Sequence, residues 1–166
     1  MSQSHIQQME SRLYSDRIEL RRSIEVRQKA GQTIVFTNGC FDILHRGHVE
    51  YLCRARDLGD ALIVGVNSDE SVRGLKGDGR PVQPLEDRMR ILASLISVDY
   101  VIGFSESTPE ALLSVLQPDV HTKGGDYDVQ ALPEAKVVQA YGGRIELIQF
   151  LDGRSSSGII RKSQSL

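Results

Sequence analysis

Apolar and polar positions along this chain follow two alternating periods. Five short runs are predicted to be strands, at 33–37, 61–66, 100–102, 120–122 and 144–148, and the first two have the β-branched and apolar composition of buried strands. Segments with apolar residues at helical spacing follow them, at 48–56, 68–75, 84–97, 109–116, 132–141 and 155–162. Strands that alternate with helices predict right-handed βαβ units, and therefore an α/β fold: a doubly wound parallel five-stranded sheet with helices on both faces.

Two of these helices carry specific predictions of burial. The helix over 48–56 is expected to pack through Val49, Leu52, Cys53 and Ala55. The helix over 84–97 is expected to pack through Met89, Leu92, Ala93 and Ile96.

The first 31 residues lie before the first predicted strand. Residues 1–14 are polar and without a clear period, so we expect a tail or a weakly held helix. Asp16 followed by Glu19 suits a helix N-cap, and Gly31 suits its end. The incomplete apolar face of this helix comprises Ile18, Leu20, Ile24 and Val26. We therefore divide the chain into an N-terminal tail and helix, 1–31, and one domain, 32–166.

Size and composition restrict the class of protein. The chain has 166 residues, 40% hydrophobic and 25% charged, which is ordinary for one globular domain. A net charge of −2 argues against a general nucleic-acid or membrane-surface binder. Cys40 and Cys53 form neither a metal-binding spacing nor a disulfide framework, so we expect reduced thiols. The absence of a long apolar run and of a signal-peptide pattern predicts a cytoplasmic protein.

The candidate chemistry is concentrated in Thr37–His48, which reads TNGCFDILHRGH. A strand, a glycine-bearing turn and the start of a helix follow one another there. Helix N-termini attract anions because their N–H groups are unpaired and the helix dipole is positive. His45 and His48 are three residues apart and can face one point once the helix has begun. This arrangement predicts a phosphate site, although an exposed His45 and a His48 packed on the sheet remain the structural alternative.

Other polar residues follow the remaining predicted strands. In parallel sheets, ligands bind beyond the carboxyl ends of the strands. The segments at those ends are 38–48, 67–68, 123–127 and 152–157. A dehydrogenase of the dinucleotide-binding type is a weaker alternative, because the first turn lacks G-x-G-x-x-G.

The TNGCFDILHRGH segment resembles the signature of the nucleotidyltransferase superfamily that carries an H-x-G-H motif. The resemblance continues through VNSDESVRGLKGDGRPV, EDRM, KGGDY and DGRSSSGIIRK, and covers roughly residues 32–162. Together these segments are most similar to the heptose 1-phosphate adenylyltransferase family, whose domain also forms the C-terminal half of a bifunctional kinase–adenylyltransferase. The resemblance implies the Rossmann-like fold of that superfamily.

The resemblance also implies a set of site residues. His45, His48 and Lys76 would contact phosphates and stabilise the transition state. The residues implied to line the nucleotide and acceptor site are Asn38, Gly39, Cys40, Phe41, Gly47, Arg88, Lys123, Gly124, Asp126, Tyr127, Ser155, Ser156 and Ser157.

Several of these residues have a structural alternative. Lys76 can be a solvated lysine, Gly47 can serve helix geometry alone, and the 123–127 segment can be a plain turn. The serines at 155–157 can cap the last helix, which does not exclude phosphate binding. Arg88 can form a salt bridge, for which the candidate partners are Asp87, Glu86 and Asp42. We expect Asp42 to bond the loop backbone rather than to hold Mg²⁺ through water.

The expected reaction is transfer of AMP from ATP to D-glycero-D-manno-heptose 1-phosphate, which gives ADP-heptose and pyrophosphate for lipopolysaccharide core or another surface glycan. A phosphate monoester has a second pKa near ~6, so no general base is needed. Mg²⁺ would arrive with ATP, bound mostly by phosphates and not by a protein metal site. The expected partners are the two substrates, a separate upstream heptose kinase and further copies of the chain.

Two alternative functions remain at this stage. The first is a cytidylyltransferase acting on glycerol 3-phosphate or another polyol phosphate. The second is a nucleotide-binding regulatory protein without turnover.

Overall fold

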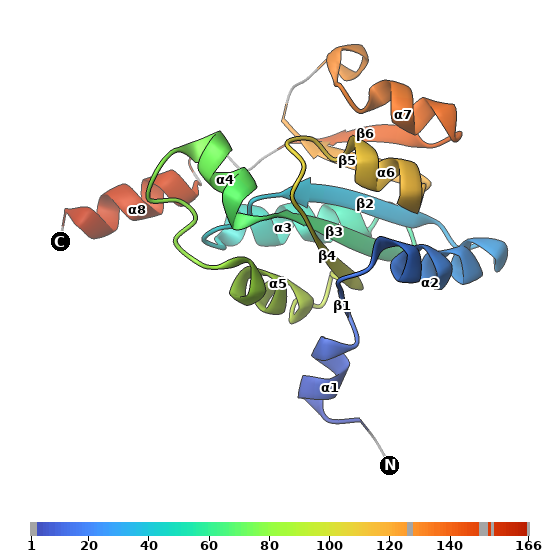
Figure 1. The fold of residues 1–166 in the computed structure, drawn as a ribbon, viewed down its shortest axis with the longest axis horizontal. Helices are drawn as coiled ribbons and strands as arrows, with labels where there is room; N and C mark the ends of the chain where they lie inside the picture. The colour runs from blue at the N-terminus through green and yellow to red at the C-terminus, as the bar shows by residue number, and fades with distance from the viewer. Residues whose placement is uncertain (1–2, 126–127, 150–152, 154, 166) are drawn as a thin grey trace.

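The computed structural model describes residues 3–125, 128–149, 153 and 155–165. A six-stranded parallel sheet runs through it, with strand order β1-β4-β3-β2-β5-β6 (Figure 1). The strands are β1 (Leu13–Tyr14), β2 (Ile34–Gly39), β3 (Ala61–Asn67), β4 (Tyr100–Phe104), β5 (Val120–Gly124) and β6 (Arg144–Ile148). The Rossmann-like parallel sheet predicted from the sequence is therefore confirmed, with one more strand than expected.

Eight α-helices and one 3₁₀ turn belong to the described residues. They are α1 (His5–Glu10), α2 (Arg17–Lys29), α3 (Arg46–Arg56), α4 (Asp69–Lys76), α5 (Leu85–Ala93), α6 (Glu110–Leu116), η1 (Val129–Ala131), α7 (Ala135–Ala140) and α8 (Ser156–Gln164). None of these helices has an apolar stretch long enough to cross a lipid bilayer.

Helices cover both faces of the sheet because its central strands are apolar on both sides (Figure 1). Leu62, Val64 and Val66 of β3 face one way and pack with residues of α3 and α5. Ala61 and Ile63 face the other way, in a second cluster with residues of α2, α6 and α7. The continuous apolar run of β3 is thus explained by two separate cores.

Successive strands are added to one side of β2 first and to its other side later. The chain passes from β2 to β3 and β4 on one side, and later adds β5 and β6 on the other. Thr37 of β2 pairs with Val64 of β3 and with Thr122 of β5, so the carboxyl ends of the three strands lie at one edge. Such a switch point is where open α/β sheets bind ligands.

The N-terminal segment differs from the expected tail. Leu13 and Tyr14 form β1, which pairs with Val101 and Ile102 of β4. Arg12 anchors the segment by donating to the carbonyl oxygens of Ala93, Leu95 and Val98 at 3.0–3.2 Å. A two-residue strand has no hydrophobic period, so the sequence pattern did not predict it.

Helix α5 ends earlier than the sequence pattern indicated. It stops at Ala93, where the capping N–H of Ser94 bonds the last turn. Ile96 is consequently 97% exposed, although Leu92 and Ala93 are buried as expected. The predicted burial of Ile96 was wrong because the helix ends before this residue, so the helical spacing no longer places it on the face of Leu92.

Three further helical predictions need correction. In α2, Leu20 and Ile24 are buried, whereas Ile18 and Val26 are exposed. In α3, Val49 is exposed, although it was expected to be buried, and Tyr51 is buried instead. The Tyr51 hydroxyl forms hydrogen bonds with the buried Thr37 and Thr122. Helix α7 begins at Ala135 and not at residue 132, since η1 and a turn precede it.

Candidate active site

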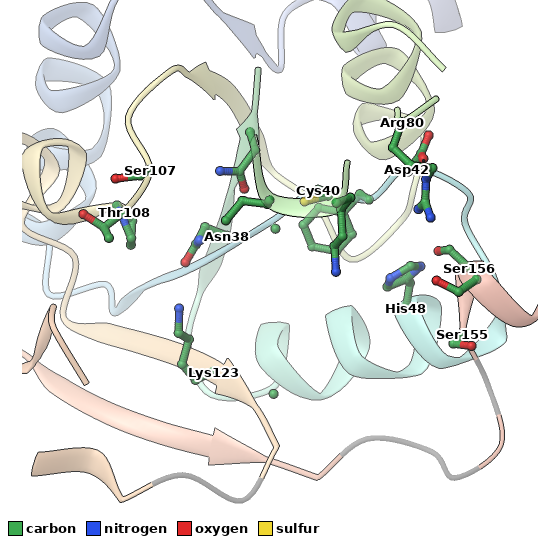
Figure 2. Close-up of a pocket in the computed structure, with 18 of the residues that line it drawn as sticks. Asn38, Cys40, Asp42, His48, Arg80, Ser107, Thr108, Lys123, Ser155 and Ser156 are labelled. Carbon is green, nitrogen blue, oxygen red and sulfur yellow. Dashed lines mark hydrogen bonds and ion pairs between the residues drawn. The ribbon is translucent and has the colours of Figure 1, made fainter. Parts of the chain in front are cut away.

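A cleft of about 740 Å³ opens at the carboxyl ends of β2, β3 and β5. Figure 2 shows side chains from several segments around it, with His48 and the α8 serines at one end and Ser107 and Thr108 at the other. The predicted residues that line the cleft are Asn38, Gly39, Cys40, Phe41, His45, His48, Lys76, Lys123, Gly124, Ser155, Ser156 and Ser157. Residues far apart in the chain are therefore brought together where the sequence analysis expected them.

The turn between β2 and α3 forms the floor of the cleft. Phe41 adopts a left-handed backbone conformation with φ of 44°, which is unusual for an aromatic residue. A side chain on Gly39 would lie 3.0 Å from the Phe41 ring, so glycine is what lets this ring fold back. Phe41 is nearly buried and contacts His48 edge-on, with centroids 5.3 Å apart. The Phe41 ring therefore packs between Gly39 and His48, and this packing holds the turn in its unusual backbone conformation.

The two histidines of the motif lie side by side at the start of α3. His45 is the N-cap residue, and its ring stacks on that of His48 with centroids 3.9 Å apart. Burial, and then repulsion by His45, lowers the pKa of His48 to about 4, although a hydrogen bond with the Ile43 backbone opposes the shift. His48 is therefore neutral at pH 7 in the free protein, and a nearby phosphate would favour its protonated form.

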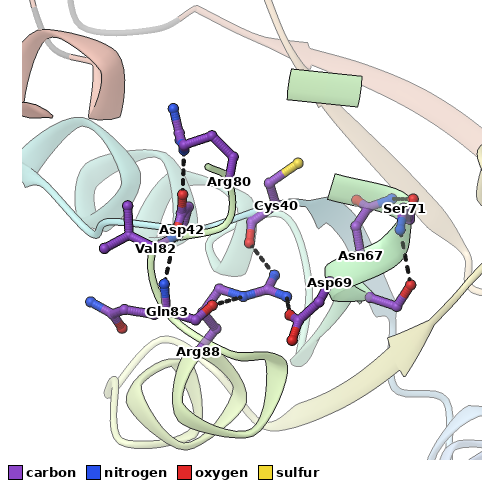
Figure 3. A network of polar contacts seen from close by, with 10 residues as sticks. Cys40, Asp42, Asn67, Asp69, Ser71, Arg80, Val82, Gln83 and Arg88 are labelled. Carbon is purple, nitrogen blue, oxygen red and sulfur yellow. Dashed lines mark hydrogen bonds and ion pairs between the residues drawn. The ribbon is translucent and has the colours of Figure 1, made fainter. Parts of the chain in front are cut away.

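Asp42 ties the loop between α4 and α5 to this floor (Figure 3). Its carboxylate accepts from Arg80 Nε at 2.5 Å and from the backbone N–H groups of Val82 and Gln83 at 2.7 and 3.1 Å. Burial raises the pKa of Asp42, but these hydrogen bonds outweigh burial and lower it overall. Asp42 thus has the backbone-bonding role that was expected, and it places Arg80 at the cleft.

Arg88 lies behind the floor and not in the cleft (Figure 3). Its side chain is fully buried and donates to Gln83 O at 3.0 Å, Cys40 O at 2.6 Å and Asp69 Oδ1 at 2.7 Å. The expectation that Arg88 contacts a ligand phosphate is corrected by this geometry, because all three guanidinium nitrogens already bind protein oxygens. The salt-bridge alternative holds, but the partner is Asp69 and not one of the three expected carboxylates.

The start of α8 borders the same cleft. Ser155 caps the helix by accepting from Gly158 N at 3.1 Å, and is thus the one of the three serines that provides the expected cap. Ser156 Oγ donates to Ile43 O at 2.9 Å, which links α8 to the loop that carries His45. Ser157 is exposed and also lines the cleft.

Three predicted site residues have a different outcome. Gly47 is buried in the first turn of α3 and is not part of the cleft lining, which fits helix geometry. Asp126 and Tyr127 lie outside the described residues, so their prediction stays open.

Asn67 lines the cleft at the end of β3, as its place at a strand end indicated. Four further polar residues line the cleft without having been assigned a site role from the sequence, namely Arg80, Ser107, Thr108 and Glu134. Arg80 shares a loop with Lys76, which was a usable signal. Glu134 carried no signal, because it fell inside a predicted helix. Its carboxylate is 2% exposed and lies 2.7 Å from Lys123 Nζ and 3.2 Å from His121 Nε2.

The cleft suits anionic ligands better than a directly bound metal. Within the described part of the chain, no group of three or more His, Cys, Asp or Glu side chains is placed to hold a metal ion. As far as the structure describes the chain, the lining carries three cations, Lys76, Arg80 and Lys123, against two carboxylates, Asp42 and Glu134, which pair with Arg80 and Lys123. Asn38 Oδ1 is buried without a hydrogen-bond partner among the described residues, so it is available to accept from a ligand hydroxyl or amino group.

The switch-point cleft and the paired histidines at a helix N-terminus form a candidate phosphate site, and the family to which the chain is matched identifies the protein as a nucleotidyltransferase. The chain belongs to the cytidylyltransferase-like family, whose sequence profile matches residues 36–161.

Comparison with known proteins refines this classification. The chain is 50% identical over 153 residues to the bifunctional protein HldE of Syntrophotalea carbinolica, which covers 90% of this chain and 31% of that protein. It is 52% identical over 147 residues to HldE of Alkalilimnicola ehrlichii, which covers 89% and 31%. The chain thus spans about a third of the length of these relatives.

Two solved structures share the fold. A lipopolysaccharide core biosynthesis protein from Thermoplasma volcanium superposes with a TM-score of 0.60 at 28% identity, over 73% of this chain and 98% of that one. A pantoate-β-alanine ligase from Francisella tularensis superposes with a TM-score of 0.54 at 17% identity, over 88% and 69%, which supports the fold alone.

Proposed function

We propose that this chain transfers AMP from ATP to D-glycero-D-manno-heptose 1-phosphate in the cytoplasm, which yields ADP-heptose and pyrophosphate for a lipopolysaccharide core or related glycan. The observation that carries the proposal is the stacked pair of His45 and His48 at the N-terminus of α3, facing the cleft. The heptose acceptor is supported by the resemblance of the LKGDGRPV and KGGDY segments, and by the structural similarity to a lipopolysaccharide core biosynthesis protein.

In the proposed reaction, an oxygen of the sugar phosphate attacks the α-phosphorus of ATP. The bond to the bridging oxygen breaks, and pyrophosphate leaves with the electron pair. The attacking oxygen is already ionised at neutral pH, so the chain has to position the groups and to stabilise negative charge. Mg²⁺ bound to the phosphates supplies further charge neutralisation.

The cleft residues divide this work. His45 and His48 donate hydrogen bonds to the phosphates around the reacting phosphorus, and His48 gains a proton as negative charge approaches. Lys76 and Arg80 neutralise phosphate oxygens from the α4–α5 side. Ser157 and the free N–H groups of the first turn of α8 hold the outer phosphates.

Pyrophosphate release tests the proposal directly. ATP, CTP and GTP are each offered with heptose 1-phosphate, glycerol 3-phosphate and other sugar and polyol phosphates, with Mg²⁺ present. We expect release with ATP and heptose 1-phosphate, and ADP-heptose in the mass spectrum. If a correctly folded protein gives no ADP-heptose from ATP and heptose 1-phosphate, the proposal is overturned.

The family match to cytidylyltransferase-like proteins favours one second candidate, a cytidylyltransferase for a polyol phosphate. Release with CTP and glycerol 3-phosphate in the same panel would support it. Binding of ATP with no pyrophosphate release for any acceptor would instead support a regulatory protein without turnover.

A further inference from the structure

Glu134 is a buried carboxylate at the wall of the cleft, and the proposed reaction does not use it. It stands at the N-cap position of α7, where its side chain makes no cap hydrogen bond. The carboxylate turns instead toward the end of β5, where Oε1 meets both Lys123 Nζ and His121 Nε2. A carboxylate this deeply buried is retained only when it is paired.

The three side chains have complementary charges and hydrogen-bonding roles. An ionised carboxylate can only accept, so His121 Nε2 carries the hydrogen that it donates to Glu134. Burial lowers the pKa of His121, which keeps the ring neutral. Burial raises the pKa of Glu134, but hydrogen bonds from His121 and Lys123 lower it overall to about 2. Glu134 is therefore a fixed anion that pairs with one cation, the Lys123 ammonium.

Lys123 remains directed into the cleft despite this pairing (Figure 2). Its side chain is 24% exposed, whereas those of Glu134 and His121 are almost completely buried. An ammonium group has three hydrogens, so the bond to Glu134 leaves two for other acceptors. A lysine held in this way has lost its rotamer freedom on folding and does not lose it again on ligand binding.

We propose that Glu134, supported by His121, is a positioning residue that holds the Lys123 ammonium in place for a phosphate group bound in the cleft. The identity of that phosphate, in the nucleotide or in the sugar phosphate acceptor, rests on the proposed function. The binding of either ligand can be measured without turnover, so the two hypotheses can be tested separately.

Calorimetric binding to the full chain provides the test. The ligands are α,β-methylene ATP with Mg²⁺ and, in a separate titration, heptose 1-phosphate. The variants are Glu134→Gln, Lys123→Met and the double variant, which together form a double-mutant cycle. Glu146→Gln is the matched control, because Glu146 is on neighbouring β6 and pairs with the exposed Arg144.

If Glu134 acts through Lys123, each single variant raises the Kd of one of the two ligands by roughly 10-fold. The double variant then binds no more weakly than Lys123→Met alone, and the ligand affected identifies the source of the phosphate. The control keeps both Kd values within about twofold of the unchanged protein.

Three outcomes overturn the inference. The first is a Glu134→Gln variant that melts earlier but keeps both Kd values, which would make the cluster purely structural. The second is an additive double variant, which would mean that Glu134 acts independently of Lys123. The third is unchanged binding by Lys123→Met, which decides the question even if Glu134→Gln does not fold.

The outcome for the proposed function is separate. The unchanged protein could release no pyrophosphate with any acceptor, while the Kd for α,β-methylene ATP rises in both single variants and rises no further in the double variant. In that case the proposed reaction fails and the positioning role stands.

Discussion

The imidazole rings of His45 and His48 stack at the first turn of α3, with centroids 3.9 Å apart and planes 22° apart. Their backbones are also joined, because His48 N donates to His45 O at 2.9 Å. Two rings this close disfavour simultaneous protonation unless an anion lies beside them. The pair is therefore suited to respond to the charge of a bound phosphate.

Replacement of His48 by alanine is expected to lower kcat by about 10²-fold or more, since removal of one donor to developing charge typically has this effect. The measurement is steady-state pyrophosphate release. His5→Ala is the matched control, because His5 lies on the exposed helix α1. Near-normal turnover by His48→Ala would mean that the ring serves only to pack against Phe41.

The pKa of His48 also predicts a pH dependence of stability. In the folded protein this pKa is about 4, below the ordinary value near 6.5, so the unfolded chain binds more protons between these values. The free energy of unfolding should then fall as pH falls from about 6.5 to about 4. Urea unfolding at pH 7 and pH 5 measures the difference. In His48→Gln it should be smaller than in the unchanged protein, and an equal difference would contradict the assignment.

Replacement of Arg88 by methionine is expected to reduce the free energy of unfolding by about 3 kcal/mol, because it leaves the partly buried carbonyl oxygens of Cys40 and Gln83 without a donor. Denaturant titration provides the measurement. Arg90→Met on the same helix is the control, since Arg90 is half exposed and should change stability by less than about 0.5 kcal/mol. Equal effects of the two variants would show that the Arg88 network is not stabilising.

Loss of the Asp42 carboxylate should release the loop that follows α4. In Asp42→Ala, the amide hydrogens of Val82 and Gln83 lose their acceptor, and their exchange with solvent should accelerate by roughly 10-fold or more. Hydrogen exchange followed by NMR resolves these two amides. Asp78→Ala, in the same loop but exposed, should leave their exchange rates unchanged. Unchanged exchange in Asp42→Ala would mean that other contacts hold the loop.

Much of this fold could be predicted from local pattern. Every predicted strand is present. The central strand β3 is a continuous apolar run, as is typical of buried parallel strands, and such a run can be identified without knowledge of its neighbours. The N-cap Asp16 was also predicted, and a cap from one of the serines at 155–157 was expected, since a cap is a local contact between a side chain and the next turn.

The failures concern residues whose partners are distant in the chain. Strand β1 exists only because β4 offers a free edge to Leu13 and Tyr14. Ile96 is exposed in the segment after α5, whose carbonyl oxygens are bound by Arg12, more than 80 residues earlier in the chain. The spacing of apolar residues within either segment does not indicate these distant contacts.

The candidate site divides in the same way. The sequence by itself determined the strand–turn–helix unit and the spacing of His45 and His48, because both are local properties of the chain. Its resemblance to a known superfamily indicated the class of reaction. Only the tertiary structure decided that Arg88 supports the floor from behind and that Glu134 holds Lys123. Those assignments depend on which distant groups share a buried space, and burial, which makes an unpaired charge unfavourable, is set by the packed fold.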